Sequence, residues 1–174
     1  MNHQDHVNLI KNGIPQGGTW ADLGSGRGAF TLALAECLGT DSHIYSVDLD
    51  QRALKTQETR FDAEFPDNKV SFMRGDFTHK LDLPPLDGII MANSLHFVRE
   101  KLPVIELLHS YLAHWGRLII VEYDTVQGNA YVPYPMTFKV WSKLAKDGGF
   151  PKTDLLATRP SSFLGQFFSS VSYK

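Results

Sequence analysis

Three glycines stand on alternate positions of a short stretch that also carries an acid. The stretch ADLGSGRGAF, residues 21–30, places Gly24, Gly26 and Gly28 after Asp22. Glycines where a strand turns into a helix let a ligand touch the backbone, and the free amides of the helix make that end partly positive. The stretch therefore predicts a ligand site at a strand-to-helix turn.

The glycine pattern alone leaves the ligand open. Gly24, Gly26 and Ala29 fit the pattern of a dinucleotide site, and a tight turn that binds no ligand also fits. An acid further along the chain suits both kinds of ligand. Asp48 ends the apolar run IYSVDLD, where a carboxylate can accept both hydroxyls of a ribose, although Asp50 beside it is the alternative.

Together these motifs resemble the class I S-adenosylmethionine-dependent methyltransferases. Asp22 and the three glycines match that family's signature of an acid followed by three alternate glycines. Asp76 in FMRGDFT stands where the family places an acid that binds the adenine amino group. The segment LAHWGRLIIVEYD is similar to the family's fifth-strand motif, although Trp115 replaces a usual glycine. A dinucleotide site would leave Asp22 and Asp76 without a use.

The resemblance implies S-adenosylmethionine as the cofactor and S-adenosylhomocysteine as its product. The cofactor-binding residues that it implies are Asp22, Gly24, Ser25, Gly26, Gly28, Asp48, Leu49, Asp76, Phe77 and Asn93. Leu49 and Phe77 are expected to be apolar walls for adenine, and Asn93 is expected near the sulfonium. An S-adenosylmethionine-binding regulatory or partner-dependent subunit, or an NAD(P)-dependent oxidoreductase, remains as an alternative.

The methyl acceptor is expected to be a small organic molecule that reacts through an oxygen, nitrogen or carbon atom. His96 is the candidate catalytic and substrate-binding residue, because histidine can take a proton near neutral pH. Tyr123, Tyr131 and Tyr134 are the other substrate-binding candidates. A structural histidine and a packed surface loop are the alternatives. The segment NSLH differs from the Asn/Asp-Pro-Pro-aromatic motif of amide and base N-methyltransferases, which argues against those acceptors.

The elements that position these residues alternate along the chain. Apolar runs predict strands at 18–24, 43–49, 69–75, 87–93 and 116–124, and helical patterns predict helices at 28–39, 50–63, 100–116 and 138–149. The segments 153–159 and 166–174 predict an antiparallel hairpin at the sheet edge. The expected fold is α/β, a three-layer sandwich with a doubly wound, mostly parallel sheet that ends in this antiparallel hairpin. The resemblance to the family implies seven strands in the sheet. One domain is expected over residues 1–174, with an N-terminal helix within 1–16 covering the cofactor site.

Composition excludes several other classes of protein. A formal charge of −2 with scattered basic residues argues against a nucleic-acid partner. The single cysteine, Cys37, excludes an intramolecular disulfide, and no apolar run reaches the length of a membrane span. We expect a cytoplasmic protein. We also expect no metal site, because the histidines are dispersed along the chain. The short chain leaves little for a cap over the substrate, so a homo-oligomer could supply one.

Overall fold

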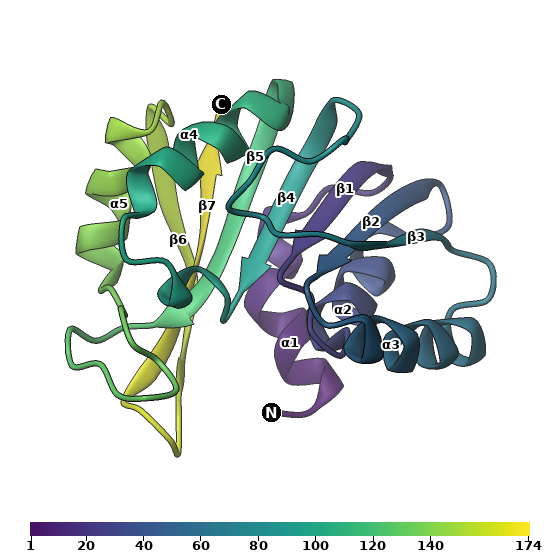
Figure 1. The fold of residues 1–174 in the computed structure, drawn as a ribbon, viewed down its shortest axis with the longest axis horizontal. Helices are drawn as coiled ribbons and strands as arrows, with labels where there is room; N and C mark the ends of the chain where they lie inside the picture. The colour runs from purple at the N-terminus through teal and green to yellow at the C-terminus, as the bar shows by residue number, and fades with distance from the viewer.

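Seven strands form one sheet in the computed structural model, which describes residues 1–174. In chain order the strands are β1 (Gly18–Leu23), β2 (Ser42–Asp48), β3 (Lys69–Arg74), β4 (Leu86–Ala92), β5 (Leu112–Tyr123), β6 (Lys152–Pro160) and β7 (Gln166–Tyr173). They lie in the order β3-β2-β1-β4-β5-β7-β6 (Figure 1). The first five strands pair in parallel, and β7 pairs antiparallel with both β5 and β6. The predicted fold class, including its C-terminal hairpin, is confirmed.

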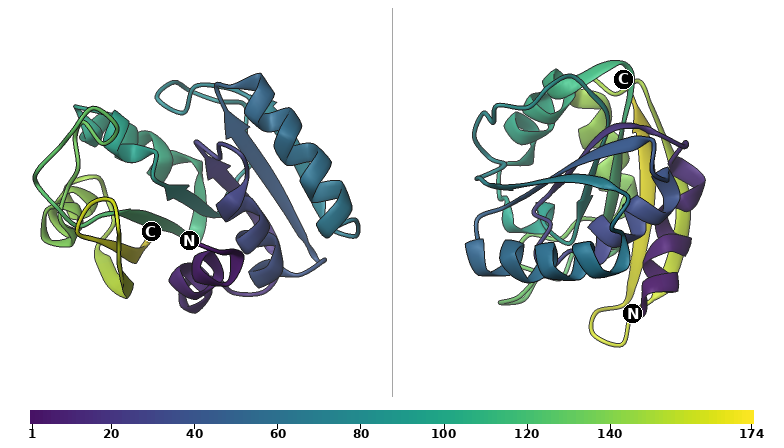
Figure 2. Two further views of the ribbon diagram at one scale, coloured as in Figure 1. Left: turned by 90° about the horizontal axis from the view of Figure 1, so that it is seen from below. Right: turned by 90° about the vertical axis from the view of Figure 1, so that its right-hand side faces the viewer.

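Helices cover both faces of the sheet. The α-helices are α1 (His3–Ile10), α2 (Ala29–Leu38), α3 (Gln51–Glu64), α4 (Lys101–Tyr111) and α5 (Phe138–Asp147), with 3₁₀ turns η1 (Lys11–Gly13) and η2 (Leu95–Phe97). Helices α1, α2 and α3 pack on one face, and α4 and α5 pack on the other (Figure 2). No helix is both long enough and apolar enough to cross a membrane.

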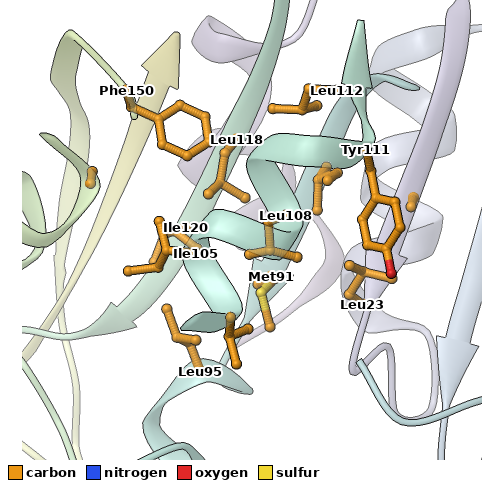
Figure 3. Packing of buried hydrophobic residues seen from close by; sticks show 14 of the residues in the cluster. Leu23, Met91, Leu95, Ile105, Leu108, Tyr111, Leu112, Leu118, Ile120 and Phe150 are labelled. Carbon is orange, nitrogen blue, oxygen red and sulfur yellow. The ribbon is translucent and has the colours of Figure 1, made fainter. Parts of the chain in front are cut away.

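The two-residue period of the central strands divides the core into two clusters. On β4, Ile89 and Met91 point to the cluster under α4 and α5, while Ile90 points to the cluster under the other three helices. Figure 3 shows Met91 among the leucine and isoleucine side chains of the first cluster. Because both faces of β4 and β5 are buried, these strands have the continuous apolar runs seen in the sequence.

One predicted helix is longer than the observed one. The pattern of residues 100–116 predicts a helix that continues to Gly116, but α4 ends at Tyr111 and β5 begins at Leu112. Leu112 pairs with Leu86 of β4, so the sheet ladder takes this part of the chain into an extended form. Leu112 is buried and Trp115 is exposed, and a strand satisfies that apolar pattern as well as a helix does.

The strand order reverses between β1 and β4, which are neighbours although β2 follows β1 in the chain. Such a reversal leaves a crevice at the carboxyl ends of the two strands. The N-terminus, the loop after β5 and the β6–β7 turn lie at the same lower edge of the sheet in Figure 1. The fold therefore brings these three separate parts of the chain to the edge of the sheet where that crevice lies.

Candidate functional site

A cleft of about 490 Å³ lies at the point where the strand order reverses, and we name it the switch-point cleft. It is lined by Gly24, Gly26, Asp48, Leu49, Asp76, Phe77, Thr78, Asn93, Ser94, Phe97 and Val98. Seven of these residues are among the ten expected to bind the cofactor. They come from the segments that follow β1, β2, β3 and β4, so the fold brings together motifs that are far apart in the sequence.

The carboxylate of Asp48 holds the glycine loop in place. Its Oδ2 accepts a hydrogen bond of 2.7 Å from the amide of Gly26, and its Oδ1 accepts one of 2.8 Å from the amide of Asp50. Gly26 has a φ of +55°, and a Cβ atom built there would have no neighbour within 4 Å. The backbone at Gly26 therefore faces open space, as close approach of a ligand requires. Asp50 instead caps α3, because its own carboxylate accepts from the amide of Arg52.

Asp76 and the two predicted apolar walls, Leu49 and Phe77, also line the cleft. Oδ1 of Asp76 accepts from both the hydroxyl and the amide of Thr78, and these bonds hold the pKa of Asp76 below its ordinary value. Phe77 lies against Gly24, where an added Cβ atom would sit 3.2 Å from the ring. Leu49 is exposed at the rim. The cleft thus combines the carboxyl groups of Asp48 and Asp76 with apolar surface.

Asp22 lies under the loop and does not line the cleft. Its side chain is buried, and its Oδ2 accepts a 2.6 Å hydrogen bond from the hydroxyl of Thr31. Burial raises the pKa of Asp22 to about 7. The structure therefore places this acid between β1 and α2 as a support for the turn, and the predicted direct contact with a cofactor has no geometric support.

Ser25 and Gly28 do not line the cleft either. The hydroxyl of Ser25 accepts from Ser46 at 2.8 Å and from the amide nitrogen of Gln57 at 3.2 Å. A Cβ atom at Gly28 would collide with the side chain of Gln57. Sequence reasoning missed Gln57, although it is the one polar residue on the buried stripe of α3, and that position was its signal.

Asn93 has an unusual backbone at the end of β4. It is the only residue other than glycine with a positive φ, at +54°. Its side-chain oxygen is buried without a hydrogen-bond partner. A strained backbone and an unpaired buried acceptor are features that cluster at functional sites. Asn93 lines the switch-point cleft and also a second hollow beside it.

The second hollow has a volume of about 450 Å³, and we name it the hairpin hollow because the β6–β7 turn forms much of it. Its lining consists of Met1, Asn93, Tyr123, Arg159, Pro160, Ser161, Ser162, Phe163 and Phe167. The ring of Tyr123 lies 4.3 Å from that of Phe167 and 6.0 Å from that of Phe163, measured between centroids. Burial raises the pKa of Tyr123, so its phenol stays neutral. Phe163 and Phe167 were missed, since aromatics in a hairpin are indistinguishable from packing residues by sequence.

His96 lines neither the cleft nor the hollow. It is buried, its Nδ1 lies 2.7 Å from one oxygen of Glu122, and its backbone amide donates to the other oxygen at 3.1 Å. Glu122 was not among the predicted site residues, although it is a buried carboxylate near the end of an apolar strand. The pair fixes the segment after β4 to the end of β5. The structure thus favours the structural alternative for His96 over the catalytic one.

The other two tyrosine candidates lie outside both spaces. Tyr134 donates its backbone amide to the carbonyl of His96, and the ammonium of Lys101 lies 5.9 Å from its ring. Tyr131 is 75% exposed and touches the hairpin hollow only through Phe163, with ring centroids 6.1 Å apart. Of the three predicted tyrosines, only Tyr123 lines the hollow.

Helix α1, which was expected to cover the cofactor site, contributes no residue to the lining of the cleft. It packs against α2, β6 and β7. The N-terminal residue that comes near is Met1, which lines the hairpin hollow. The covering role of residues 1–16 stays a prediction.

Comparison with known proteins gives consistent matches. A family model described as a methyltransferase domain matches residues 15–149. A curated relative, 2-phytyl-1,4-naphtoquinone methyltransferase of Trichormus variabilis, is 33% identical over 133 residues, which are 74% of this chain and 55% of the relative. This chain therefore spans little more than half the length of that relative.

Solved structures share the fold at low sequence identity. A SAM-dependent methyltransferase from Aquifex aeolicus aligns with a TM-score of 0.72 and 16% identity over 99% of this chain and 98% of its own. Phospholethanolamine N-methyltransferase 2 of Haemonchus contortus, solved with S-adenosylhomocysteine, aligns with a TM-score of 0.78 and 12% identity over 98% of this chain and 52% of its own. At these identities the likeness concerns the fold.

Proposed function

Since the chain belongs to the S-adenosylmethionine-dependent methyltransferases with the class I fold, we propose that it transfers a methyl group to a small organic molecule. The acceptor atom is an oxygen, nitrogen or carbon. One observation carries the proposal: the switch-point cleft and the hairpin hollow share Asn93, so a cofactor in one space would adjoin an acceptor in the other.

The residues of the switch-point cleft suit S-adenosylmethionine. The open backbone at Gly26 admits a ligand, and the carboxylates of Asp48 and Asp76 suit the ribose hydroxyls and the adenine amino group. Leu49 and Phe77 supply apolar surface for the adenine ring. The buried, unpaired oxygen of Asn93 would accept a hydrogen bond from the amino-acid end. When bound, the cofactor supplies a methyl group already activated on a sulfonium.

The chain's own contribution is orientation and exclusion of water. With an activated methyl group, alignment of the acceptor can provide much of the acceleration. His96 is engaged by Glu122 and lines neither space, so we assign it the role of holding the wall of the site. Tyr123, whose phenol is neutral, is the substrate-contact residue that we retain from the sequence prediction.

A flat ring is the acceptor that the hairpin hollow suits best. Its walls include three aromatic side chains, and aromatic rings favour stacked or edge-on contact with another ring. The name of the Trichormus variabilis relative refers to a naphthoquinone, which is also a flat ring. We therefore propose that aromatic or quinone-derived molecules are the first acceptors to test.

Calorimetry with S-adenosylmethionine, S-adenosylhomocysteine and NAD tests the cofactor. We expect both sulfur ligands to bind and NAD to show no heat; binding of NAD alone would reject the proposal in favour of an oxidoreductase. Release of S-adenosylhomocysteine with pooled phenols and quinols then tests transfer. Tight cofactor binding with no product across the pool would favour the regulatory alternative.

Three further sequence predictions remain part of this proposal. They are one methyltransferase domain over residues 1–174, a homo-oligomer that could cap the acceptor site, and a cytoplasmic location. Light scattering of the purified chain measures the oligomeric state, and fractionation of cells measures the location.

A further inference from the structure

Arg159 is the one residue with a charged side chain among those that line the hairpin hollow. It stands near the end of β6, opposite Phe167 of β7, so the sheet fixes its backbone beside an aromatic wall of the hollow. An arginine has five N–H donors arranged in a plane, which suits a carboxylate or another flat anion.

The guanidinium of Arg159 is only partly used within the protein. Its Nη2 donates one hydrogen bond of 2.8 Å to Oδ2 of Asp5, and no other acceptor lies within hydrogen-bonding distance. The same oxygen of Asp5 also accepts from the amide of Asn2 at 2.9 Å. One oxygen of Asp5 thus accepts two hydrogen bonds, of which only one comes from Arg159. The other N–H groups of the Arg159 guanidinium have no hydrogen-bond partner within the protein.

The aromatic walls and the cation belong to one lining. The rings of Tyr123 and Phe167 lie against each other with centroids 4.3 Å apart, and Phe163 has 53% of its surface exposed. Asn93, which belongs to the hollow and to the switch-point cleft, marks the side from which the methyl group would come. A ring held by the aromatics can thus present one edge to the cleft while a substituent reaches Arg159.

We propose that the hairpin hollow selects a flat-ring acceptor that carries an anionic group such as a carboxylate, and that Arg159 determines this selectivity. The inference rests on the proposed function and adds the charge of the acceptor to it. No bond to Arg159 forms or breaks; the guanidinium recognises the anion through its free N–H donors.

Two probes of nearly the same shape but different charge test the proposal. The protein is saturated with S-adenosylhomocysteine and titrated with 4-hydroxybenzoate or with the neutral 4-hydroxybenzamide. We expect the carboxylate to bind about fivefold more tightly, because a charge-assisted contact at a partly exposed arginine is of modest strength. The preference should shrink at 0.5 M salt and should vanish in Arg159→Gln. Equal affinities in the wild type, or no binding of either probe, would overturn it.

Asp5→Asn distinguishes recognition of the acceptor's anionic group by Arg159 from a purely structural role of the Arg159–Asp5 ion pair. This variant breaks the ion pair but frees the guanidinium, so we expect binding of 4-hydroxybenzoate to stay as tight or become tighter, while Arg159→Gln weakens it. If the ion pair matters only for packing α1 on β6, both variants will weaken both probes alike, and the proposal fails. Lys152→Gln at the far end of β6 is the matched control and should change neither affinity.

The cofactor titration keeps the two proposals distinguishable. Loss of the probe preference with normal binding of S-adenosylhomocysteine would reject only the role of Arg159. Failure of the wild type to bind S-adenosylhomocysteine would reject the proposed methyltransferase function itself.

Discussion

Replacing Asp48 by alanine tests whether the switch-point cleft binds the cofactor. The carboxylate lines the cleft and at the same time accepts from the amides of Gly26 and Asp50. Asp48→Ala removes the acceptor proposed for the ribose hydroxyls and releases the glycine loop that lines the cleft. Both losses act on the bound state in the same direction.

The size of the effect follows from the number of charged hydrogen bonds that are lost. A hydrogen bond to a charged group contributes about 1.5–3 kcal/mol, which corresponds to a roughly 10- to 150-fold weaker affinity for S-adenosylmethionine. Asp50→Ala is the control. It removes the cap of α3, which we expect to lower the free energy of unfolding by about 1 kcal/mol with little change in affinity.

Isothermal calorimetry with S-adenosylhomocysteine measures both affinities, and circular dichroism verifies that each variant is folded. If folded Asp48→Ala binds as tightly as the wild type, Asp48 does not hold the ribose and the assignment of the cleft is wrong. If Asp50→Ala loses the affinity instead, the two neighbouring acids have exchanged roles.

Three further predictions concern the parts that support the site. Asp22→Asn should make stability less dependent on pH, because burial raises the folded pKa of Asp22 to about 7. Between about pH 4 and pH 7 this carboxyl is ionised in the unfolded chain but protonated in the folded one, so the wild type loses up to about 4 kcal/mol of stability as the pH rises. Thermal unfolding across this range measures the difference. Gly26→Ala should weaken cofactor binding and lower the free energy of unfolding by about 1 kcal/mol. Gly28→Ala should lower the free energy of unfolding by about 2–3 kcal/mol, because the new methyl group would collide with Gln57. Urea titrations that give equal values for the two variants would refute this contrast. Glu122→Ala should lower the free energy of unfolding by about 3 kcal/mol, because it leaves buried His96 without its partner, and a denaturant midpoint unchanged from the wild type would contradict that reasoning.

The sequence was sufficient to predict most of the fold because each signal was local. Strands and helices of the first half alternate with clear periods, and Asp50 caps the helix that it was predicted to begin. The one large error, the end of α4, arose where Leu112 fits a helix face and a sheet equally well. Pairing with β4 decided that case, and pairing is a long-range interaction.

Within the glycine loop, the sequence predicted the position of the site but not the direction of each side chain. Alternate glycines look equivalent in the pattern, yet the loop turns Gly26 to open space and Gly28 to Gln57 of α3. Asp22 shares the signature with them and is nevertheless buried against α2. Direction depends on the dihedral angles of the loop and on partners many residues away, and neither can be inferred from spacing.

The difference between the two halves of the site has a physical origin in the doubly wound sheet. The switch-point cleft is formed by residues that directly follow strand ends, so the strand pattern that predicts the fold also predicts these residues. The hairpin hollow is formed by the N-terminus, one residue after β4, the end of β5 and the β6–β7 turn. The hairpin supplies six of the nine lining residues and carries no recognisable motif, and the surface exists only after β7 inserts between β5 and β6. Under the proposed assignment of the hairpin hollow to the acceptor, specificity can change through Arg159 or Phe163 without any change to the residues proposed to bind the cofactor. For the same reason the sequence predicts the cofactor more firmly than the acceptor.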